Sequence, residues 1–504
     1  MTNRPGSDPI HRAFHAQLRQ AVRSARAMSG PRARENMRPM FGVGVDGVDA
    51  GAGFDGVWSL GGDCSGTPSL LARGLSASPA LSAAIDSIVT AYMTNPLLNV
   101  PNGAVMVIAP DGRLVHVKAY TWRGGDAGGD DRFCANIHSK FRIGSISKLF
   151  TAVATLSLID KGYIRGEGGF GGFIEGALDA RVGPYSATLS PTGRSGLYDV
   201  TFEQLLTHTA GLYDQEGRSC KPIARNACLA GRSPGPIIDA TVVASLGTTL
   251  PATLEDRIEW LDGSRKSDPE QFWTYSNSGF VLLGEVLDHT APGGYDGWVT
   301  DQILTPLGMT DTVPGLTRIE DRQRNEVRYY DTTRGGAGTG QSWFSSDSLQ
   351  LPICYGGSWN QDPTAASGGW ISSAADMAKF AYDMLYRSKS RVLSVPARAA
   401  MYATRLPAFP AQGLAWFIDG SLYGGTGARD KTGHHTGTNA HLIKYGSGAN
   451  SAAGCTWFYV FNRYGGSGAF PQQQANLESA VGQALGTGGT TVDWGSGDLF
   501  GMIS

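Results

Sequence analysis

The sequence predicts an α+β fold in which one antiparallel sheet is assembled from both ends of the main body and a helical lobe is inserted between them. Two strand-like runs lie near the start of this body, at 103–109 and 114–121, and three lie near its end, at 413–418, 440–445 and 456–462. Helical patterns and loop-like stretches fill the interval between the two groups. Strands and helices segregated in this way along a chain are typical of an α+β fold.

Local patterns support the elements in order. Residues 80–92 carry apolar side chains at helical spacing. Asp111-Gly112 separates the first two strand-like runs, and Asp-Gly in that setting is a strong hairpin signal. At the far end, Pro471 stands near the start of a closing helix, one face of which carries Leu477, Val481 and Leu485.

The composition is that of a globular protein with a sizeable core. Hydrophobic residues make up 41% of the 504 positions, charged residues make up 17%, and the net charge is -2. This balance excludes disorder caused by a high net charge, and it lacks the excess of basic residues that is typical of nucleic-acid-binding proteins. No run approaches the ~20 apolar residues that a membrane-spanning helix needs, so we expect no integral membrane span. The sequence leaves the oligomeric state open.

We expect three parts along the chain: an N-terminal extension over 1–79, a main domain over 80–488 and a tail over 489–504. In the extension, Ile10–Met28 has apolar residues four apart with arginines around them, which is typical of a basic amphipathic helix. Such a helix can bind a membrane or act as a targeting segment, but docking on the body or a poorly ordered leader is favoured. Gly42–Gly74 has the Gly-, Asp- and Ser-rich composition of a linker.

The stretch between Gly162 and Pro269 has a loop-like composition, and we interpret it as decoration of one domain. Two of the six cysteines, Cys220 and Cys228, lie within it and are close enough in sequence to close a small disulfide loop. Free, mostly buried thiols are the alternative with equal support. No Cys-x-x-Cys pair occurs, which argues against a zinc ribbon or a thioredoxin-like redox site.

The most informative motif opens an apolar helix that ends near Lys161. It is the only Ser-x-x-Lys of the chain, and Ser145 and Lys148 share one face of the first turn because residues three apart on a helix are neighbours. A serine hydroxyl is a weak nucleophile that needs a base beside it, and a lysine can be that base when burial lowers its pKa. The motif therefore predicts a nucleophile and its base. An N-cap serine followed by a solvated lysine would give the same pattern.

A second motif lies at the entry of another apolar helix, 280–287. Tyr275 and Asn277 occupy the loop before it in the order Tyr-x-Asn. A phenol there can carry a proton between the nucleophile and a leaving group, and an amide can bind a substrate carbonyl. A turn followed by a helix-capping asparagine is the structural alternative.

A third motif consists of four residues that lead into the run 440–445, namely His435, Thr436, Gly437 and Thr438. The glycine permits a ligand to approach the backbone, and the amide of Thr438 can form an oxyanion hole with that of Ser145. The neighbouring His434 and His435 point to opposite faces of a strand and are poorly placed to chelate one ion. We therefore expect no metal site.

The three motifs, in this order, resemble those of the serine beta-lactamase and penicillin-binding protein superfamily. The Tyr-x-Asn form is similar to the class C-like branch with its D-alanyl-D-alanine carboxypeptidases, esterases and D-amino-acid peptidases. Val200–Leu212 and Gly368–Phe380 resemble two further segments of these proteins, and the resemblance covers roughly 80–488. It implies a beta-lactamase/transpeptidase-like fold, with a five-stranded antiparallel sheet flanked by helices and an inserted helical lobe.

The resemblance also implies roles for the motif residues. Ser145 is the nucleophile that becomes acylated, Lys148 is its base partner, Tyr275 is the second proton-transfer group and Asn277 contacts the substrate. No cofactor is implied. We predict a serine hydrolase that acts through an acyl-enzyme on an amide or ester of a small molecule or peptide. A beta-lactamase, or an inactive penicillin-recognising binding or sensor module, is the alternative.

The third motif allows two alignments with the superfamily. We favour His-Thr-Gly at 435–437, because the apolar run follows it directly. This alignment places Gly437 and Thr438 on the edge strand lining the site. Lys-Thr-Gly at 431–433 is the alternative alignment. A histidine is only partly charged at neutral pH, so this choice predicts that penicillins are at most slow substrates or inhibitors. The family and the even cysteine number favour an extracytoplasmic location, although no secretory signal is recognisable, and a cytoplasmic location stays open.

Overall fold

The structure, a computed structural model, describes residues 70–503 apart from 124–132, 167–173, 194–195, 213–220, 223–238, 264–268, 271, 333–337, 344–348, 358, 407–411 and 466–467. The amphipathic helix expected at Ile10–Met28 lies outside the described residues, as do Cys220 and Cys228. The expected linker lies outside them up to residue 69.

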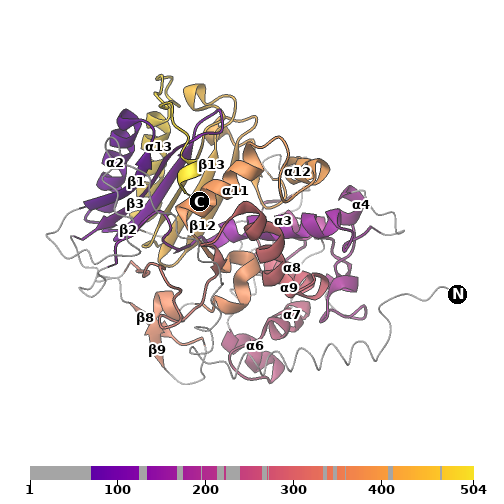
Figure 1. Ribbon diagram of the computed structural model, residues 1–504. Helices are drawn as coiled ribbons and strands as arrows, with labels where there is room; N and C mark the ends of the chain where they lie inside the picture. The colour runs from indigo at the N-terminus through magenta and orange to yellow at the C-terminus, as the bar shows by residue number, and fades with distance from the viewer. Residues whose placement is uncertain are drawn as a thin grey trace, which may run out of the picture. The chain divides into compact units, whose positions relative to one another are not determined.

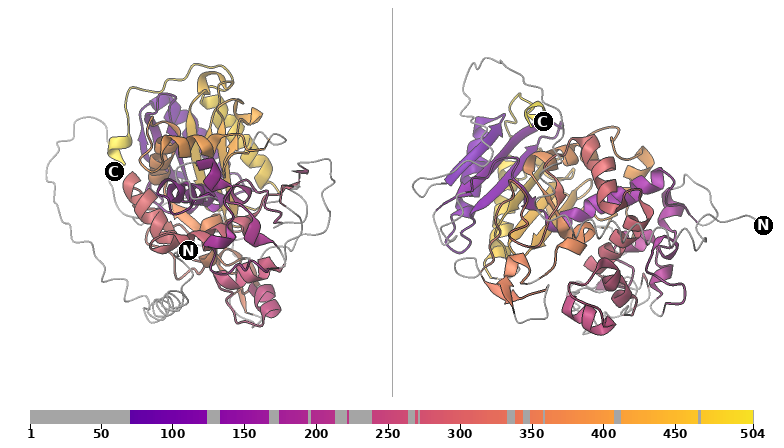
Figure 2. Two further views of the ribbon diagram at one scale, coloured as in Figure 1. Left: turned by 90° about the vertical axis from the view of Figure 1, so that its right-hand side faces the viewer. Right: turned by 60° about the horizontal axis from the view of Figure 1, so that its bottom comes forward.

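The centre of the fold is a seven-stranded sheet in which all neighbouring strands are antiparallel (Figure 1). In spatial order the strands are β1 (Leu70–Ser76), β3 (Leu114–Trp122), β2 (Asn102–Ile108), β14 (Thr456–Phe461), β13 (Thr438–Lys444), β12 (Arg429–His435) and β11 (Phe417–Ile418). Early and late strands meet where β2 pairs with β14, as the indigo and yellow strands of Figure 2 show. The predicted assembly of the sheet from two distant parts of the chain is confirmed.

The prediction of five strands is wrong, because two strands lack the apolar pattern on which it rested. β12 has the sequence Arg-Asp-Lys-Thr-Gly-His-His, and tertiary contacts bury Asp430 and Lys431 and half-bury its other polar side chains. β1 is an edge strand that pairs with β3 over seven residues, so the sheet begins within the expected extension 1–79. The strand expected at 413–418 shortens to the two residues of β11.

Helices cover both faces of the sheet. The helices α2 (Pro79–Met93) and α13 (Phe470–Ala484) pack on one face, and α11 (Ala374–Leu385) packs on the other (Figure 1). Side chains alternate along β2 accordingly: Ala104 and Met106 belong to the core on the α11 side, whereas Val105 belongs to the core on the α2 side. Every residue of β2 is buried, because both of its faces are covered.

The inserted lobe is helical, as predicted, but the stretch read as loop-like holds helices as well. The lobe and its borders contain α3 (Ser147–Asp160), α4 (Ile174–Leu178), α5 (Phe202–Leu206), α6 (Asp239–Leu246), α7 (Leu254–Asp262), α8 (Asn277–Thr290), α9 (Gly294–Val299), α10 (Thr305–Leu307) and α12 (Val395–Tyr402). Short strands form three further sheets, which are β4 (Phe141–Arg142) with β10 (Trp370–Ser372) and β7 (Val313–Pro314), β5 (Lys221–Pro222) with β6 (Phe272–Trp273), and β8 (Thr339–Gln341) with β9 (Gln350–Pro352).

The C-terminal segment 489–503 packs on the sheet rather than forming a separate tail. The amide of Leu499 donates to the carbonyl oxygen of Leu114 at 2.9 Å, and its side chain is buried. Among the cysteines in the described part, Cys134 is disulfide-bonded, and Cys354 and Cys455 are buried free thiols. None of the helices in the described ranges is both long and apolar enough to cross a membrane.

Candidate active site

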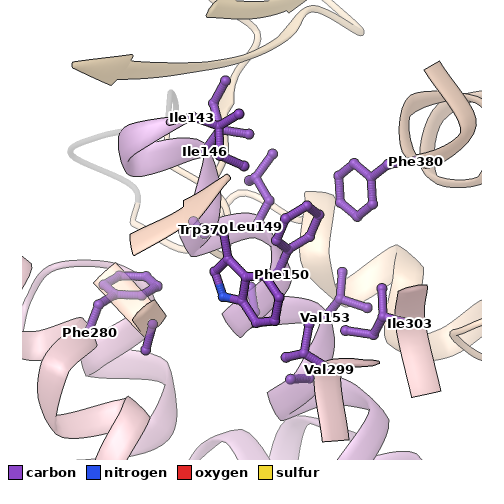
Figure 3. Packing of buried hydrophobic residues seen from close by; sticks show 14 of the residues in the cluster. Ile143, Ile146, Leu149, Phe150, Val153, Phe280, Val299, Ile303, Trp370 and Phe380 are labelled. Carbon is purple, nitrogen blue, oxygen red and sulfur yellow. The ribbon is translucent and has the colours of Figure 1, made fainter. Parts of the chain in front are cut away.

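The start of α3 exposes Ser145 alone among its neighbours. From residue 141 to residue 150, every residue is buried except Ser145. The short strand β4 pairs with β10, a 3-10 turn (Gly144–Ile146) follows, and α3 then runs through the core. Figure 3 shows the apolar side chains of this segment gathered around Phe150, whose ring lies edge-on to Trp370 and Phe380 at 5.9 and 5.0 Å. Packing therefore fixes the turn that presents the hydroxyl.

Two glycines bring this turn against strand β12. A Cβ added to Gly433 would lie 1.9 Å from the carbonyl oxygen of Ile143, and one added to Gly144 would lie 2.9 Å from the amide nitrogen of His434. Gly144 also has φ +51, a left-handed conformation that favours glycine. The backbone of 433–434 thus lies directly beside the residue that precedes Ser145.

Lys148 lies below Ser145 and is fully buried. Its Nζ donates to Ser145 Oγ at 3.2 Å and to Asn277 Oδ1 at 2.7 Å, and it also donates to the carbonyl oxygen of Ser367. Ser367 belongs to a π-helical turn, Ala365–Gly369, which α3 also holds through a bond from Thr151 Oγ1 to the carbonyl oxygen of Ala366. The acceptors that these bonds give the ammonium are all uncharged.

The structure brings Tyr275 and Asn277 to the same place. Ser276 caps α8 by accepting the amide of Gly279 at 3.0 Å, so Asn277 is the first helical residue and Tyr275 lies on the approach. Lys148 Nζ is 5.0 Å from the centre of the Tyr275 ring. Both side chains are half-buried. The four residues predicted from the first two motifs are therefore neighbours.

Lys431 on β12 is a second lysine at this site. Its Nζ lies 5.2 Å from the centre of the Tyr275 ring and 5.2 Å from that of Phe417. The side chain is 1% exposed, and its Nζ has no hydrogen-bond partner among the described residues. Burial lowers the pKa of Lys431 to about 7, against a smaller opposing effect of Asp430. Sequence reasoning placed this residue in the less favoured alignment.

The favoured third motif, His435–Thr438, spans the end of one strand, a turn and the start of the next strand. β12 ends at His435, and Thr436 and Gly437 form the turn into β13, so the expectation that Gly437 lies on an edge strand is wrong. A Cβ on Gly437 would meet Cys354 Sγ at 2.6 Å and Tyr329 Cβ at 3.0 Å. The reason is register: pairing of β12 with β13 brings 438 opposite 435 and leaves the turn between them.

His435 and Thr438 contact the borders of the site. Nε2 of His435 lies 3.2 Å from the carbonyl oxygen of Gly368, and its ring stacks on Trp359 at 3.9 Å. Burial lowers the pKa of His435 to about 3. Thr438 is fully buried and donates through Oγ1 to the carbonyl oxygen of Arg142 at 2.7 Å, which supports the backbone before the nucleophile turn.

His434 and His435 diverge, as the strand pattern predicts. His434 stacks on Tyr464, whereas His435 stacks on Trp359. The described residues contain no group of three or more His, Cys, Asp or Glu side chains that could hold a metal ion. The chemistry that the site can offer is that of a partly exposed hydroxyl, two lysines, a phenol and an amide.

A family of known proteins matches most of this chain. The sequence model of the Beta-lactamase family matches residues 85–481. The chain is 24% identical over 269 residues to penicillin-binding protein 4 of Amycolatopsis lactamdurans, which covers 52% of this chain and 56% of that protein. A human beta-lactamase-like protein is 26% identical over 307 residues, 60% of this chain. The chain spans about half the length of these two relatives.

Solved structures share the fold. The D-amino acid amidase of Ochrobactrum anthropi SV3 superimposes with a TM-score of 0.56 at 18% identity, over 81% of this chain and 100% of the amidase. The octameric penicillin-binding protein homologue of Pyrococcus abyssi gives a TM-score of 0.54 at 20% identity, over 80% of this chain and 76% of its own. These likenesses establish the beta-lactamase/transpeptidase-like α+β fold.

Proposed function

Because this chain belongs to the beta-lactamase family, we propose that it is a serine hydrolase that forms an acyl-enzyme on Ser145. The observation that carries the proposal is the position of Lys148, whose Nζ lies 3.2 Å from Ser145 Oγ and 2.7 Å from Asn277 Oδ1. A buried lysine that touches the one exposed hydroxyl of a buried segment is suited to activate it.

The proposed reaction has two halves. Ser145 Oγ bonds to the carbonyl carbon of an ester or amide, and its proton passes through Lys148 and Tyr275 to the leaving alcohol or amine as the carbonyl–heteroatom bond breaks. A water molecule then attacks the acyl carbon, its proton returns to Ser145 Oγ, and the free acid leaves. Lys148 and Lys431 both lie beside the phenol, and whichever of them is protonated favours negative charge on Tyr275 during these transfers.

The backbone beside Ser145 supplies the candidate oxyanion site. The amide of His434 lies next to Gly144, so we assign the oxyanion hole to the amides of Ser145 and His434 in place of the expected Thr438. Thr438 is opposite His435 in the ladder and is buried.

Lys431 shapes the substrate proposal. A buried cation without a hydrogen-bond partner among the described residues favours a substrate that carries a carboxylate or another electron-rich group at that end. We therefore propose amides and esters of acylated amino acids or short peptides as substrates. The relatives whose names refer to D-amino acid amides and penicillin make D-amino-acid amides the first compounds to test.

Lys431 also supports a second candidate. The expectation of poor penicillin turnover rested on a histidine at the third motif, and a lysine beside Tyr275 removes that argument. Penicillins, which carry a carboxylate, are therefore the second candidate class of substrate.

Covalent labelling and turnover test the proposal together. A fluorophosphonate should add to the peptide that contains Ser145, and Ser145→Ala should abolish labelling and lower turnover of p-nitrophenyl esters and D-amino-acid anilides by several orders of magnitude, on the scale of about 10⁴-fold or more. Ser147→Ala is the matched control, because Ser147 is buried and its Oγ accepts the amide of Trp370. Labelling that persists in Ser145→Ala would refute the assignment. Labelling without turnover of any ester, anilide or penicillin would favour the inactive binding module.

A further inference from the structure

His208 is a buried histidine that the proposed reaction does not use. It follows α5, is 3% exposed and has φ +63, a left-handed conformation that is uncommon for any residue other than glycine. Backbone strain of this kind persists where the surroundings demand it, and it is frequent near functional sites.

His208 holds the chain on both sides of Tyr275. Its carbonyl oxygen accepts the amide of Thr274 at 3.0 Å, and its ring nitrogen Nδ1 accepts the amide of Ser276 at 3.1 Å. One residue therefore holds the backbone amides of the two residues that flank Tyr275. An acceptor at Nδ1 also requires the proton of the neutral ring to be on Nε2.

The ring of His208 lies against the phenol itself. The centres of the His208 and Tyr275 rings are 4.4 Å apart, and Phe280 and Trp273 enclose the imidazole at 5.2 and 6.1 Å. The pKa of His208 lies well below its usual value, because of burial and of the positive charges of Lys431 and Lys148. The neutral form of the ring, in which Nδ1 can accept a hydrogen bond, is therefore favoured.

An apolar residue at 208 could fill the same space but could not accept the Ser276 amide. A buried amide without an acceptor is unfavourable, and a shift of the 274–276 segment would relieve this. Such a shift moves the phenol relative to Lys148 Nζ, now 5.0 Å from its ring. Proton transfer depends on sub-ångström placement, and misplacement by about 1 Å can cost 10²-fold in rate.

We propose that His208 is the positioning residue of Tyr275: its carbonyl oxygen and Nδ1 fix the flanking backbone, and its ring supports the phenol beside Lys148. The inference rests on the proposed function, because it matters only if Tyr275 transfers protons. It predicts that the contribution of His208 to turnover passes through the Tyr275 hydroxyl.

A double-mutant cycle tests this dependence. His208→Asn and His208→Leu have similar shapes, but only asparagine keeps an acceptor near Nδ1 and tolerates the left-handed backbone. In the wild-type background, His208→Leu should lower kcat for a p-nitrophenyl ester about tenfold or more with little change in KM, whereas His208→Asn should retain most of the activity. In the Tyr275→Phe background, His208→Leu should cost no further activity.

Two measurements separate positioning from general destabilisation. His116→Leu removes another fully buried histidine, on β3, and should lower the melting temperature without lowering kcat of the folded enzyme. His208→Ala replaces His208→Leu in the cycle if the leucine variant does not fold. Equal losses in both backgrounds, or a loss in His208→Asn as large as in His208→Leu, would overturn the inference while leaving the proposed function intact. A wild-type enzyme without esterase or amidase turnover would overturn both.

Discussion

At the scale of single residues, the site places one phenol between two buried lysines. Lys148 Nζ and Lys431 Nζ lie 5.0 and 5.2 Å from the centre of the Tyr275 ring. Their surroundings differ, because Lys148 has Ser145, Asn277 and a backbone carbonyl as acceptors, whereas Lys431 Nζ has no acceptor in the described part of the chain. The two lysines should therefore respond differently to substitution.

Substitution of Lys148 should affect the chemical step. Lys148→Met keeps the length of the side chain and removes the amine, so we expect kcat for ester hydrolysis to fall by about 10²–10⁴-fold, the usual contribution of an acid–base group. Lys118→Met is the matched control, because Lys118 is paired with Asp86 on α2 and lies outside the site. Equal turnover of the Lys148→Met enzyme and wild type in steady-state assays would contradict the role of Lys148 as the base partner.

Lys431 should make the binding of anionic substrates depend on pH. With a pKa of about 7, the side chain is charged below pH 7 and neutral above it, so the KM for a carboxylate-bearing peptide should rise as the pH passes through 7. The KM for the corresponding amide should change less. Lys431→Gln should abolish the difference between the two substrates, measured from pH 5.5 to 8.5. A difference that persists in Lys431→Gln would assign the anion contact elsewhere.

At the scale of elements, the close approach of β12 to the turn Gly144–Ile146 organises the candidate site. It is possible because Gly433 faces the carbonyl of Ile143, and it brings the amide of His434 beside Gly144, while Lys431 on the same strand lies beside Tyr275. The π-helical turn 365–369 completes the enclosure by presenting the carbonyl of Ser367 to Lys148. Irregular π-helical turns of this kind often occur at functional sites.

Gly433→Ala should separate strand and turn. The new Cβ would lie 1.9 Å from the carbonyl oxygen of Ile143, so β12 or the turn must shift by more than about 1 Å, and we expect turnover to fall roughly 10²-fold or more. Gly297→Ala is the control, because a Cβ there meets nothing within 4 Å. It should leave turnover unchanged and should not lower the melting temperature. Wild-type turnover in Gly433→Ala would contradict the proposed contact.

At the scale of the whole molecule, buried histidines should make the stability of the protein depend on pH. His441 lies between Asp430 and Glu478, at 3.2 and 2.8 Å, and the hydrogen bonds and charges of these carboxylates raise its pKa to about 9 despite burial. Its stabilising contribution is complete below about pH 6.5 and is lost as the pH rises through 9. Burial lowers the pKa of His116 to about 3 and that of His434 to about 4, so these rings oppose folding increasingly as the pH falls below 6.5.

Two buried lysines have the opposite effect to that of His441, because burial lowers the pKa of Lys431 to about 7 and that of Lys444 to about 8, so folding becomes more favourable as the pH rises toward 10.5. Relative to wild type, His441→Gln should lose stability below about pH 6.5, on the order of 2–4 kcal/mol for the shift of the His441 pKa, and the loss should vanish above about pH 9. His116→Gln should weaken the decline on the acid side. Urea titrations at intervals from pH 4 to 10 measure both differences from wild type. A difference between His441→Gln and wild type that stays constant across this range would show that His441 does not cause this pH dependence.

The sequence alone identified the candidate reacting groups and the class of the fold. Ser145, Lys148, Tyr275 and Asn277 were recognisable because each lies at the entry of an apolar helix, where short-range spacing places side chains on one face. The apolar runs of β2 and β14 were recognisable because both of their faces are buried. The local pattern is enough to predict an element and its side chains where the element is apolar and buried.

Only the tertiary structure decided what lies beside those groups. β12 is polar along its length and was missed as a strand, so the choice between Lys431 and His435 depended on a ladder register with β13 that adjacent residues do not encode. The contact of Gly433 with the Ile143 carbonyl joins segments about three hundred residues apart. The hydrogen bond from Lys148 to Ser367 joins segments more than two hundred residues apart. Such contacts form only when two distant segments pack together, and the sequence around either segment does not show which other segment it will meet.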